Sequence, residues 1–251
     1  MPHARRQITV QVGKVPFQVT TVDSAVSAIY DFAESKESLS IRLSNAYCVA
    51  LASQDPLYES LLNGPGINLP DGAPVAWFMR RTNLSARQVR GPSLFKAVLE
   101  EGQTRPMRHF FLGSTDSTLT KLSKKVAEQY PGTQVSGTYS PPFAPIDEDF
   151  YRQCTSVLEH TNPDIIWVAL GTPKQDFVAE ELAVRTGAVC IAVGAAFDFT
   201  AGTSKEAPAW IRRFTLEWLY RLATEPKRLW KRYIFGNVRF LYSAAIHSRK
   251  G

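Results

Sequence analysis

The amino-acid sequence predicts an α/β fold: a Rossmann-like, mostly parallel sheet flanked by helices on both faces, with a C-terminal helical appendage. The first reason is that strand-like runs such as "DIIWVAL" and "VCIAVG" are apolar almost throughout, as in strands buried on both faces. The second is that amphipathic helical patterns separate these runs along the chain. The third is a basic, aromatic segment at the end of the chain, which predicts the appendage.

The first half of the chain begins with a predicted hairpin, "QITVQVGKVPFQVT". Apolar residues at helical spacing then predict a helix in "TVDSAVSAIYDFAES", capped by Thr21 or Asp23. The run "SIRLSNAY" is predicted as a strand that ends in Asn45, and "GINLP" as a short strand that leads into Asp71. Two more helices are predicted in "DPLYESLLN" and "GPSLFKAVLEEG".

The second half alternates more regularly. Strands are predicted in "RHFFLGS", "QVSGTYSP", "DIIWVAL" and "VCIAVG". Helices are predicted between them in "DSTLTKLSKKVAEQY", "DEDFYRQCTSVLEHT" and "DFVAEELAVRTG". In the tail, Pro226 suits the first turn of a further helix, with Thr224 as its cap.

The composition suits one large core, because 44% of the 251 residues are hydrophobic. The three cysteines show no CxxC spacing, which favours buried, reduced thiols. The N-terminus has no apolar stretch of the signal-peptide kind, and no run approaches the roughly 18 apolar residues of a membrane-spanning helix. We therefore expect a cytoplasmic protein that is soluble or at most peripheral on a membrane.

Charge divides the chain near residue 204. Residues 205–251 hold eleven Lys/Arg against three Glu, a net charge of +8, whereas the whole chain carries +6. We therefore expect a core, residues 1–204, and an appendage, residues 205–251. Such asymmetry predicts a polyanionic partner for the appendage, and it leaves nucleic acid, a diphosphate and an anionic membrane as alternatives.

Polar residues follow several of the predicted strands. In open α/β sheets, ligands bind in the crevice beyond the carboxyl ends of the strands. Those ends carry "SNA", "PDG", "GS", "GTPKQ" and "GAAFDFTAG", so Asn45, Asp71, Gln175 and Asp198 are candidates for one crevice. A Pro-Asp-Gly sequence also forms turns for structural reasons alone, but several polar residues on one rim favour a functional Asp71.

The loop "GTPKQ" offers a site for an anion. Gly171 and Pro173 shape the loop, and the start of the following helix presents N–H groups. Lys174 adds a positive charge, and Gln175 adds a donor and an acceptor. Neither GxxxxGK[ST] nor GxGxxG occurs in the chain, so these letters alone are weak evidence for a nucleotide diphosphate.

Two other patterns are interpreted as structural. The run "DED", Asp147–Asp149, matches the DxD letters of metal-dependent glycosyltransferases, but it opens an amphipathic helix, where acidic residues serve as caps. The four histidines are scattered and make no metal cluster. We therefore expect neither a metal ion nor a cofactor.

A resemblance to a known family runs in order from roughly residue 8 to residue 242, and a series of longer motifs carries it: "SNAYCVALASQDPLYESLLN", "NLPDG", "QVRGPSLF", "FFLGS", "YPG", "GTPKQ", "VGAAFDFTAG", "KEAPAWIRR" and "LEWLYRLATEPKRLWKRYIFGNVRFL". Together they resemble the WecG/TagA/CpsF glycosyltransferases. The combination of PDG, PKQ, FDFxAG and EWLYRLxxEPxRLxxRY is highly specific, so we do not attribute the resemblance to chance.

The resemblance implies an inverting, metal-independent transfer from a UDP-sugar, carrying N-acetylmannosamine or another hexose, onto an undecaprenyl-diphosphate-linked sugar. Such reactions build cell-surface polysaccharides or teichoic-acid-type glycopolymers. The resemblance also implies a Rossmann-like core and an appendage that meets the membrane, on the inner face of the cell membrane. Asp71 matches the family's proposed catalytic base, Asn45 its TxNA asparagine and Gln175 its PKQ glutamine.

Two positions depart from the family pattern. Leu43 stands where the TxNA threonine is expected, and Ser93 stands where the family usually has an aspartate. Both could affect sugar selectivity. The donor sugar, the acceptor sugar and the linkage are therefore not inherited from the resemblance, and a homo-oligomeric state stays open.

The expected chemistry needs one base, because inverting transfer forms no glycosyl-enzyme, and Asp71 on its Pro-Gly turn supplies a carboxylate. We place UDP between the two loops that follow adjacent strands, at Gly171, Thr172, Pro173, Lys174, Gly194, Phe197 and Asp198. Basic side chains would stabilise the leaving diphosphate. For the diphosphate of the acceptor we expect Arg221, Arg228 and Arg232.

Helical spacing arranges the tail into stripes. At 100° per residue, Arg228, Arg232 and Arg239 fall within about 40° of each other, and so do Leu229, Tyr233 and Phe240. A preceding helix would align Trp210, Phe214 and Trp218. A basic stripe beside an aromatic one suits a helix on an anionic leaflet, but packing of the aromatics against the body explains the pattern too.

Two other functions compete with transfer to a lipid-linked acceptor. A nucleotide-binding module with a nucleic-acid-binding tail explains the charge, but it leaves Asp71 and the aromatic stripe without roles. We therefore expect no nucleic-acid partner. A nucleotide-sugar transferase with a soluble acceptor is the second alternative, and it would keep its activity without the tail.

Overall fold

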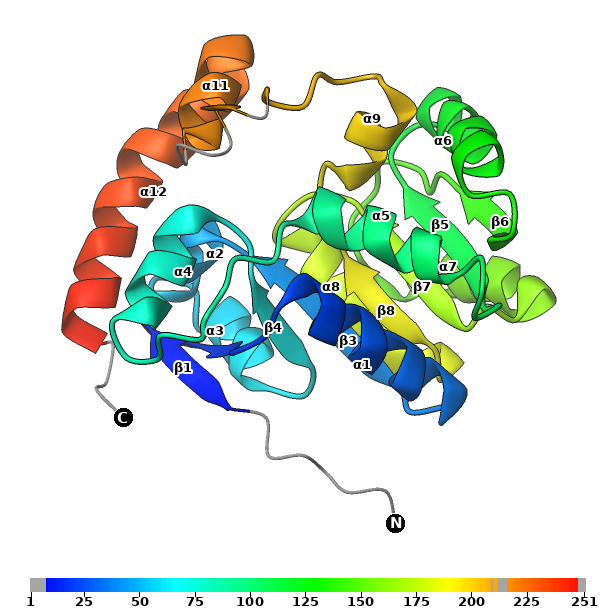
Figure 1. The fold of residues 1–251 in the computed structure, drawn as a ribbon, viewed down its shortest axis with the longest axis horizontal. Helices are drawn as coiled ribbons and strands as arrows, with labels where there is room; N and C mark the ends of the chain where they lie inside the picture. Colours follow the sequence, from blue (N-terminus) through cyan, green and yellow to red (C-terminus); the bar gives the residue numbers. More distant parts are fainter. Residues whose placement is uncertain (1–7, 209, 212–215, 248–251) are drawn as a thin grey trace.

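The computed structural model describes residues 8–208, 210–211 and 216–247, apart from the side chains of 228, 231–235 and 247. Its centre is a sheet of six parallel strands in the order β4-β3-β8-β7-β5-β6 (Figure 1). The strands are β3 (Leu39–Ser44), β4 (Ile67–Pro70), β5 (Arg108–Gly113), β6 (Gln134–Tyr139), β7 (Ile165–Ala169) and β8 (Val189–Ala192). The predicted Rossmann-like α/β architecture is therefore confirmed.

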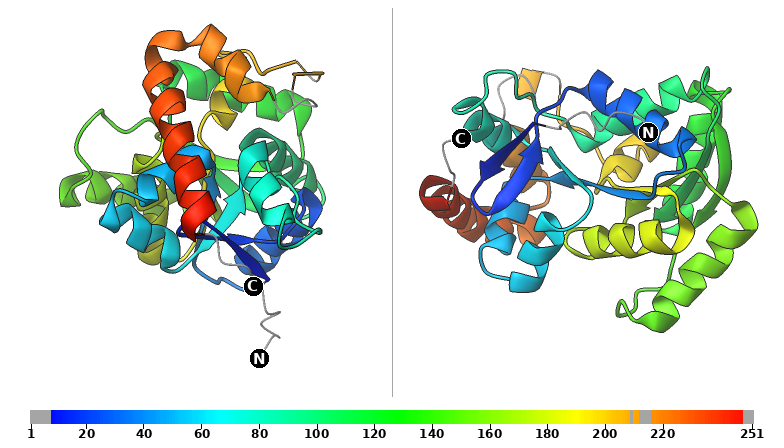
Figure 2. Two further views of the ribbon diagram at one scale, coloured as in Figure 1. Left: turned by 90° about the vertical axis from the view of Figure 1, so that its left-hand side faces the viewer. Right: turned by 90° about the horizontal axis from the view of Figure 1, so that it is seen from below.

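Helices cover both faces of the sheet (Figure 2). One face packs against α1 (Val22–Glu34), α5 (Gly91–Glu101), α6 (Asp116–Gln129) and α9 (Ala196–Ala201). The other packs against α7 (Glu148–Thr161) and α8 (Lys174–Thr186). Successive side chains alternate between the faces, so that Trp167 of β7 joins the first cluster and Val168 the second. The near-continuous apolar strands are explained by this double burial.

A second core lies beside the β4 edge of the sheet. It is built by the hairpin β1 (Thr9–Val12) and β2 (Val15–Gln18) and by α2 (Ala46–Ala52), α3 (Pro56–Asn63) and α4 (Ala73–Arg80). Phe240 and Ala244 belong to the same cluster, although they come from α12 (Pro226–His247). The long C-terminal helix thus runs alongside α2 and α4 (Figure 1).

The C-terminal segment forms two described helices, α11 (Glu217–Thr224) and α12. Pro226 begins α12 as predicted, which puts Glu225 and not Thr224 at the N-cap position. The Thr224 hydroxyl donates to the carbonyl oxygens of Tyr220 and Arg221 in the preceding helix. The predicted row of Trp210, Phe214 and Trp218 on one helix stays a prediction. Trp218 lies in α11, which begins at Glu217, and Phe214 lies outside the described residues.

Three short helices were not predicted, namely α2, α4 and α9. Each follows a strand end or loop that carries a candidate site residue, and each is eight residues or shorter. Such short segments contain too few turns for a helical period to stand out in the sequence. The sequence left Thr21 and Asp23 as alternative caps of α1. In the structure Thr21 is the cap, because its hydroxyl oxygen accepts from the Ser24 N–H at 3.2 Å.

Candidate active site

The carboxyl ends of the strands meet helix α11 around two adjoining cavities. The first, of about 300 Å³, is walled by residues of α2, α4, α11 and α12. The second, of about 430 Å³, is walled by residues that follow β5, β7 and β8. Four side chains line both cavities: Asn45, Asp71, Glu217 and Arg221. The rim predicted from the strand ends therefore borders both of these cavities.

Asp71 stands at the junction of the two cavities because of the turn that carries it. Its backbone N–H donates to the Ser44 carbonyl at 3.0 Å, which ties the end of β4 to the end of β3. Gly72 then adopts φ 105°, a conformation that side chains with a Cβ rarely reach. The Pro-Asp-Gly turn thus fixes the backbone while the carboxylate remains at the cavity wall.

The surroundings of Asp71 favour its protonated form. Burial, and after it the negative charge of Glu217, raise the pKa of Asp71 to about 6. The positive charges of Arg90 and Arg221 and a hydrogen bond from the Gly91 N–H act in the opposite direction. A carboxylate with a pKa near neutrality can hold or release a proton under ordinary conditions, as a general base must.

The side-chain amide of Asn45 uses its oxygen to cap a helix, and its nitrogen has no described partner. It caps α2, and its Oδ1 accepts from the Tyr47 N–H at 3.0 Å. No described residue accepts a hydrogen bond from its Nδ2, which belongs to a side chain that lines both cavities. Capping therefore orients the amide so that a donor is left for a ligand.

Gln175 joins two of the loops at the strand ends. The side chain is only 1% exposed, and its Oε1 accepts from the N–H groups of Gly171 at 3.1 Å and Gly194 at 3.2 Å. One oxygen thereby holds together the loops that follow β7 and β8. Its amide nitrogen donates to no described residue, and the residue lines the second cavity.

The residues predicted to hold UDP are only partly brought together. Gly171, Thr172, Gly194 and Asp198 line the second cavity, and Asp198 accepts from the Thr203 hydroxyl at 3.2 Å. Three others are not part of that lining. Pro173 precedes α8 as its N-cap, the Lys174 ammonium donates to the Ala144 carbonyl at 2.8 Å, and Phe197 packs against Phe95 and Phe111 in the core.

Arg221 is the one residue of the predicted arginine trio with a described side chain. It lines both cavities, and its guanidinium carbon lies 5.8 Å from the ring centroid of Phe199. Its Nε is buried without a hydrogen-bond partner, and no described acid forms an ion pair with it. Arg228 and Arg232 lie in α12, but their side chains are outside the described part of the structure.

Several lining residues were not singled out from the sequence, in particular Arg90, Glu217 and Ser114. Arg90 donates from Nε and Nη2 to the two carboxylate oxygens of Glu217, at 2.9 and 2.8 Å. The signal was present in "QVRGPSLF" and "LEWLYRL", but no local spacing indicates that these distant motifs pair. Two residues differ from the family pattern, Leu43 and Ser93. Leu43 lines the second cavity, and the Ser93 hydroxyl accepts a hydrogen bond from Arg90 at 3.3 Å.

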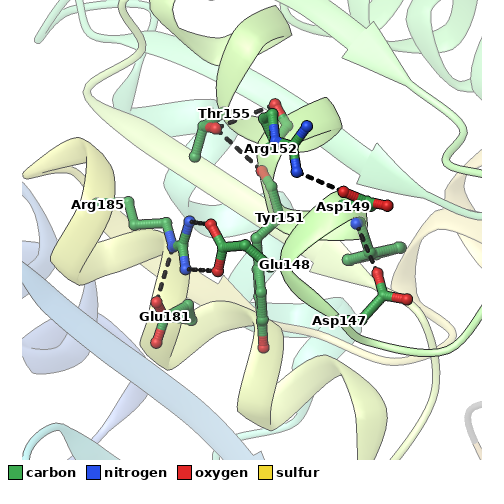
Figure 3. Close-up of polar contacts among 9 residues, drawn as sticks. Asp147, Glu148, Asp149, Tyr151, Arg152, Thr155, Glu181 and Arg185 are labelled. Carbon is green, nitrogen blue, oxygen red and sulfur yellow. Dashed lines mark hydrogen bonds and ion pairs between the residues drawn. The ribbon is translucent and has the colours of Figure 1, made fainter.

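The acidic run at the start of α7 lines neither of the two cavities, and its contacts are drawn in Figure 3. Asp147 caps the helix by accepting from the Phe150 N–H at 2.9 Å, which confirms the cap interpretation. Glu148 forms two hydrogen bonds of 2.7 Å with Arg185, and Asp149 pairs with Arg152 (Figure 3). None of these acids lines either cavity. Within the described residues, no cluster of three or more His, Cys, Asp or Glu could hold a metal ion.

Comparisons with known proteins identify relatives of this chain. The model of the glycosyl transferase WecG/TagA/CpsF family matches residues 10–251, almost the whole chain. The chain belongs to this family. A similar relative from Bacillus subtilis, named N-acetylglucosaminyldiphosphoundecaprenol N-acetyl-beta-D-mannosaminyltransferase, is 31% identical over 85% of this chain and 84% of its own. A relative of the same name from Bacillus spizizenii is 31% identical over 73% of this chain and 70% of its own.

Because the chain belongs to a family of glycosyl transferases, the two cavities at the strand ends are the candidate active site. Within the described part of the chain, no helix combines the length and the apolar character needed to cross a membrane.

Proposed function

We propose that this glycosyltransferase moves a sugar from a UDP-sugar onto a sugar carried by undecaprenyl diphosphate, with inversion and without a metal ion. The names of the two relatives, which specify an N-acetylglucosaminyldiphosphoundecaprenol acceptor, support the lipid-linked acceptor. The observation that carries the proposal is that Asp71 and Arg221, an arginine without an ion pair to any described acid, share the walls of two adjoining cavities. One cavity suits each substrate, and the two functional groups stand where the substrates would meet.

In the proposed reaction, an acceptor hydroxyl attacks the anomeric carbon of the donor sugar. The new carbon–oxygen bond forms on one face while the bond to UDP breaks on the other, and UDP leaves with the electron pair. The hydroxyl proton passes to the carboxylate of Asp71. One carboxylate is sufficient, because no covalent glycosyl-enzyme has to form. The raised pKa of Asp71, about 6, makes it a stronger base than an ordinary aspartate.

The second cavity is assigned to the UDP-sugar. Its walls carry the hydroxyl groups of Ser114 and Thr172, the amide of Gln175 and the carboxylate of Asp198. These groups suit a nucleotide with many hydrogen-bonding atoms. The first cavity is assigned to the acceptor, because Trp218, Phe240 and Leu241 give it apolar walls beside the amide groups of Gln88 and Asn237.

Arg221 is assigned to the phosphates. A guanidinium presents several N–H groups in a planar fork that matches phosphate oxygens, and it carries its charge at any ordinary pH. The side chain already lies at the boundary of the cavities and has no described acid to neutralise it. It can therefore stabilise the charge that develops on the leaving diphosphate, or hold the diphosphate of the acceptor.

The outer side of α12 supports contact with a membrane. Leu229 and Phe240, each 2% exposed, face the body of the protein, where Phe240 belongs to the second core and Leu229 lines the second cavity. These two members of the predicted apolar stripe are therefore not available to a membrane. A different stripe is exposed, at spacings of three, four and eight residues: Val238, Leu241, Tyr242 and Ile246. Leu241 also lines the first cavity. The proposed acceptor cavity therefore opens beside the surface that would rest on the leaflet.

The test is a transfer assay with a panel of UDP-sugars and two acceptors, N-acetylglucosaminyl diphosphoundecaprenol and free N-acetylglucosamine. Mass spectrometry should detect one added sugar on the lipid-linked acceptor only, with the same rate in the presence of EDTA. Equal transfer to the free sugar would favour the soluble-acceptor alternative. Loss of activity on chelation, restored by Mg²⁺ or Mn²⁺, would contradict the metal-independent mechanism.

A further inference from the structure

A carboxylate from the C-terminal segment lies in the candidate site, beside the proposed base. A second negative charge at that place repels the ionised base and would repel the phosphates of the substrates, so we ask what it does there. Glu217 begins α11 and lines both cavities with Asp71. Its two oxygens accept from Nε and Nη2 of Arg90, at 2.9 and 2.8 Å. Such a paired geometry fixes both side chains more tightly than a single contact would.

Arg90 is held on its other side as well. Its Nη2 also donates to Glu206 at 3.0 Å, and its Nη1 donates to the Ser93 hydroxyl at 3.3 Å. Lys96 forms a further ion pair with Glu206 at 3.4 Å. The guanidinium of Arg90 is therefore directed towards Glu217 and Glu206, both of which come from the chain after α9.

The position of Arg90 in the chain brings it close to the proposed base. It is the N-cap residue of α5, and the next residue, Gly91, offers its N–H to Asp71. Even so, no described basic side chain forms an ion pair with Asp71. A direct ion pair with an arginine typically lowers the pKa of an aspartate by about 1–3 units, which would make it a weaker base.

We propose that Glu217 is a positioning residue: by accepting both hydrogen bonds from Arg90, it holds that guanidinium off Asp71 and fastens α11, with Arg221, over the cavities. This inference rests on the proposed function, because it needs Asp71 as the base. It assigns the appendage a role in the chemistry of the site that is separate from membrane contact. The charged or titratable side chains around Asp71 are Glu217 and Arg221 of α11, Arg90 before α5, Tyr47 of α2 and Asp198 of α9.

The test is the pH dependence of kcat/KM in three variants of the full chain. The base acts when it is deprotonated, so activity should rise with pH around a midpoint set by Asp71. Glu217→Gln leaves Arg90 free to approach Asp71, and the midpoint should move down by about one unit or more, with a lower plateau. Arg90→Gln leaves Glu217 beside Asp71 without its cation, and the midpoint should move up.

The double variant Arg90→Gln/Glu217→Gln removes both charges, so its midpoint should return towards that of the unchanged protein. A charge that acts on Asp71 by itself would shift the midpoint equally with and without Arg90, whereas a residue that holds Arg90 off Asp71 shifts it more when Arg90 is present. If Glu217→Gln fails to fold, Glu217→Asp replaces it: the shorter side chain keeps the charge but loosens the hold on Arg90, so its midpoint should also move down. The double variant leaves neither partner of the pair buried alone, which favours its folding.

Glu59→Gln is the matched control, because Glu59 forms an ion pair of 2.7 Å with Lys14 and lines neither cavity. Its midpoint should not change. Equal midpoints in all three site variants would overturn the role of Glu217 while leaving the proposed function intact. Asp71→Asn, measured in parallel, separates the proposed function from the role of Glu217. If that variant keeps its rate and its activity still rises with pH around the same midpoint, Asp71 is not the base, and the role of Glu217 fails with it.

Discussion

Asp71 and Arg221 line the same two cavities, and no ion pair joins them. The two side chains come from distant parts of the sequence: Asp71 lies on the turn after β4, and Arg221 lies on α11. An ion pair between them would weaken the carboxylate as a base and occupy the guanidinium. Their separation leaves each free for a different part of the proposed reaction, the proton for Asp71 and the phosphates for Arg221.

Replacement of Arg221 should affect turnover more than stability. Arg221→Ala should lower kcat/KM by about 10²-fold, in the range seen when a group that stabilises transition-state charge is removed. Arg221→Lys should restore only part of it, because an ammonium lacks the planar fork of a guanidinium. Steady-state kinetics and thermal melting check both statements. Arg152→Ala, at an exposed arginine of α7 that lines neither cavity, is the control, and full activity in Arg221→Lys would mean that charge alone matters.

Gln175 combines two roles that two substitutions separate. Gln175→Glu keeps an acceptor oxygen for the Gly171 and Gly194 N–H groups but loses the amide donor that faces the second cavity. Gln175→Ala loses both. We expect both variants to weaken UDP binding in calorimetry, and the alanine variant, which releases the Gly171 and Gly194 N–H groups, to lower the melting temperature. Unchanged UDP affinity in the glutamate variant would show that the amide serves the loops alone.

The exposed stripe of α12 should control binding to vesicles. Val238→Ser/Ile246→Ser removes two apolar side chains, 67% and 57% exposed, that line neither cavity. Co-sedimentation with phosphatidylglycerol vesicles should show binding at least about tenfold weaker, since each buried aliphatic side chain contributes about 1.5–3 kcal/mol. Val184→Ser, a 73% exposed position on α8, is the control. Equal loss in the control would contradict the assignment of the stripe.

The raised pKa of Asp71 predicts a gain in stability when its charge is removed. The pKa rises from 3.8 to about 6 on folding, so the folded state holds the proton more tightly than the unfolded state. Ionised Asp71 therefore costs stability above pH 6, and this cost disappears as the pH falls towards 3.8. Asp71→Asn should raise the melting temperature by at least about 2 °C at pH 8 and by almost nothing at pH 4. A lower melting temperature at pH 8 would contradict the burial of a charge at this position.

The sheet could be predicted from the sequence because its strands and long helices carry strong periodic signals. Trp167 and its neighbours in β7 are apolar on both faces, and α6 and α7 show clear helical spacing. The rule for ligand sites in parallel sheets then placed Asn45, Asp71 and Gln175 on one rim, where the structure has them.

The remaining features depend on contacts between distant segments. Nothing in the letters around Lys174 indicates that its ammonium turns to the Ala144 carbonyl and away from the second cavity. The pairing of Arg90 with Glu217 joins residues that are 127 positions apart. The inward face of α12 also depends on a partner surface, since the same stripe of Leu229 and Phe240 fits a membrane or a core equally well.

The rate of sugar transfer by Asp71→Asn tests the central claim most directly. Asparagine has nearly the same shape and can still accept a hydrogen bond, but it cannot take the proton from the acceptor hydroxyl. We expect the variant to bind UDP normally and to transfer sugar at least about 10²-fold more slowly, the usual scale for a general base. Asp149→Asn, at an exposed acid outside both cavities, should transfer at the normal rate. A near-normal rate in Asp71→Asn would contradict the account and leave Asp71 as a residue of the turn.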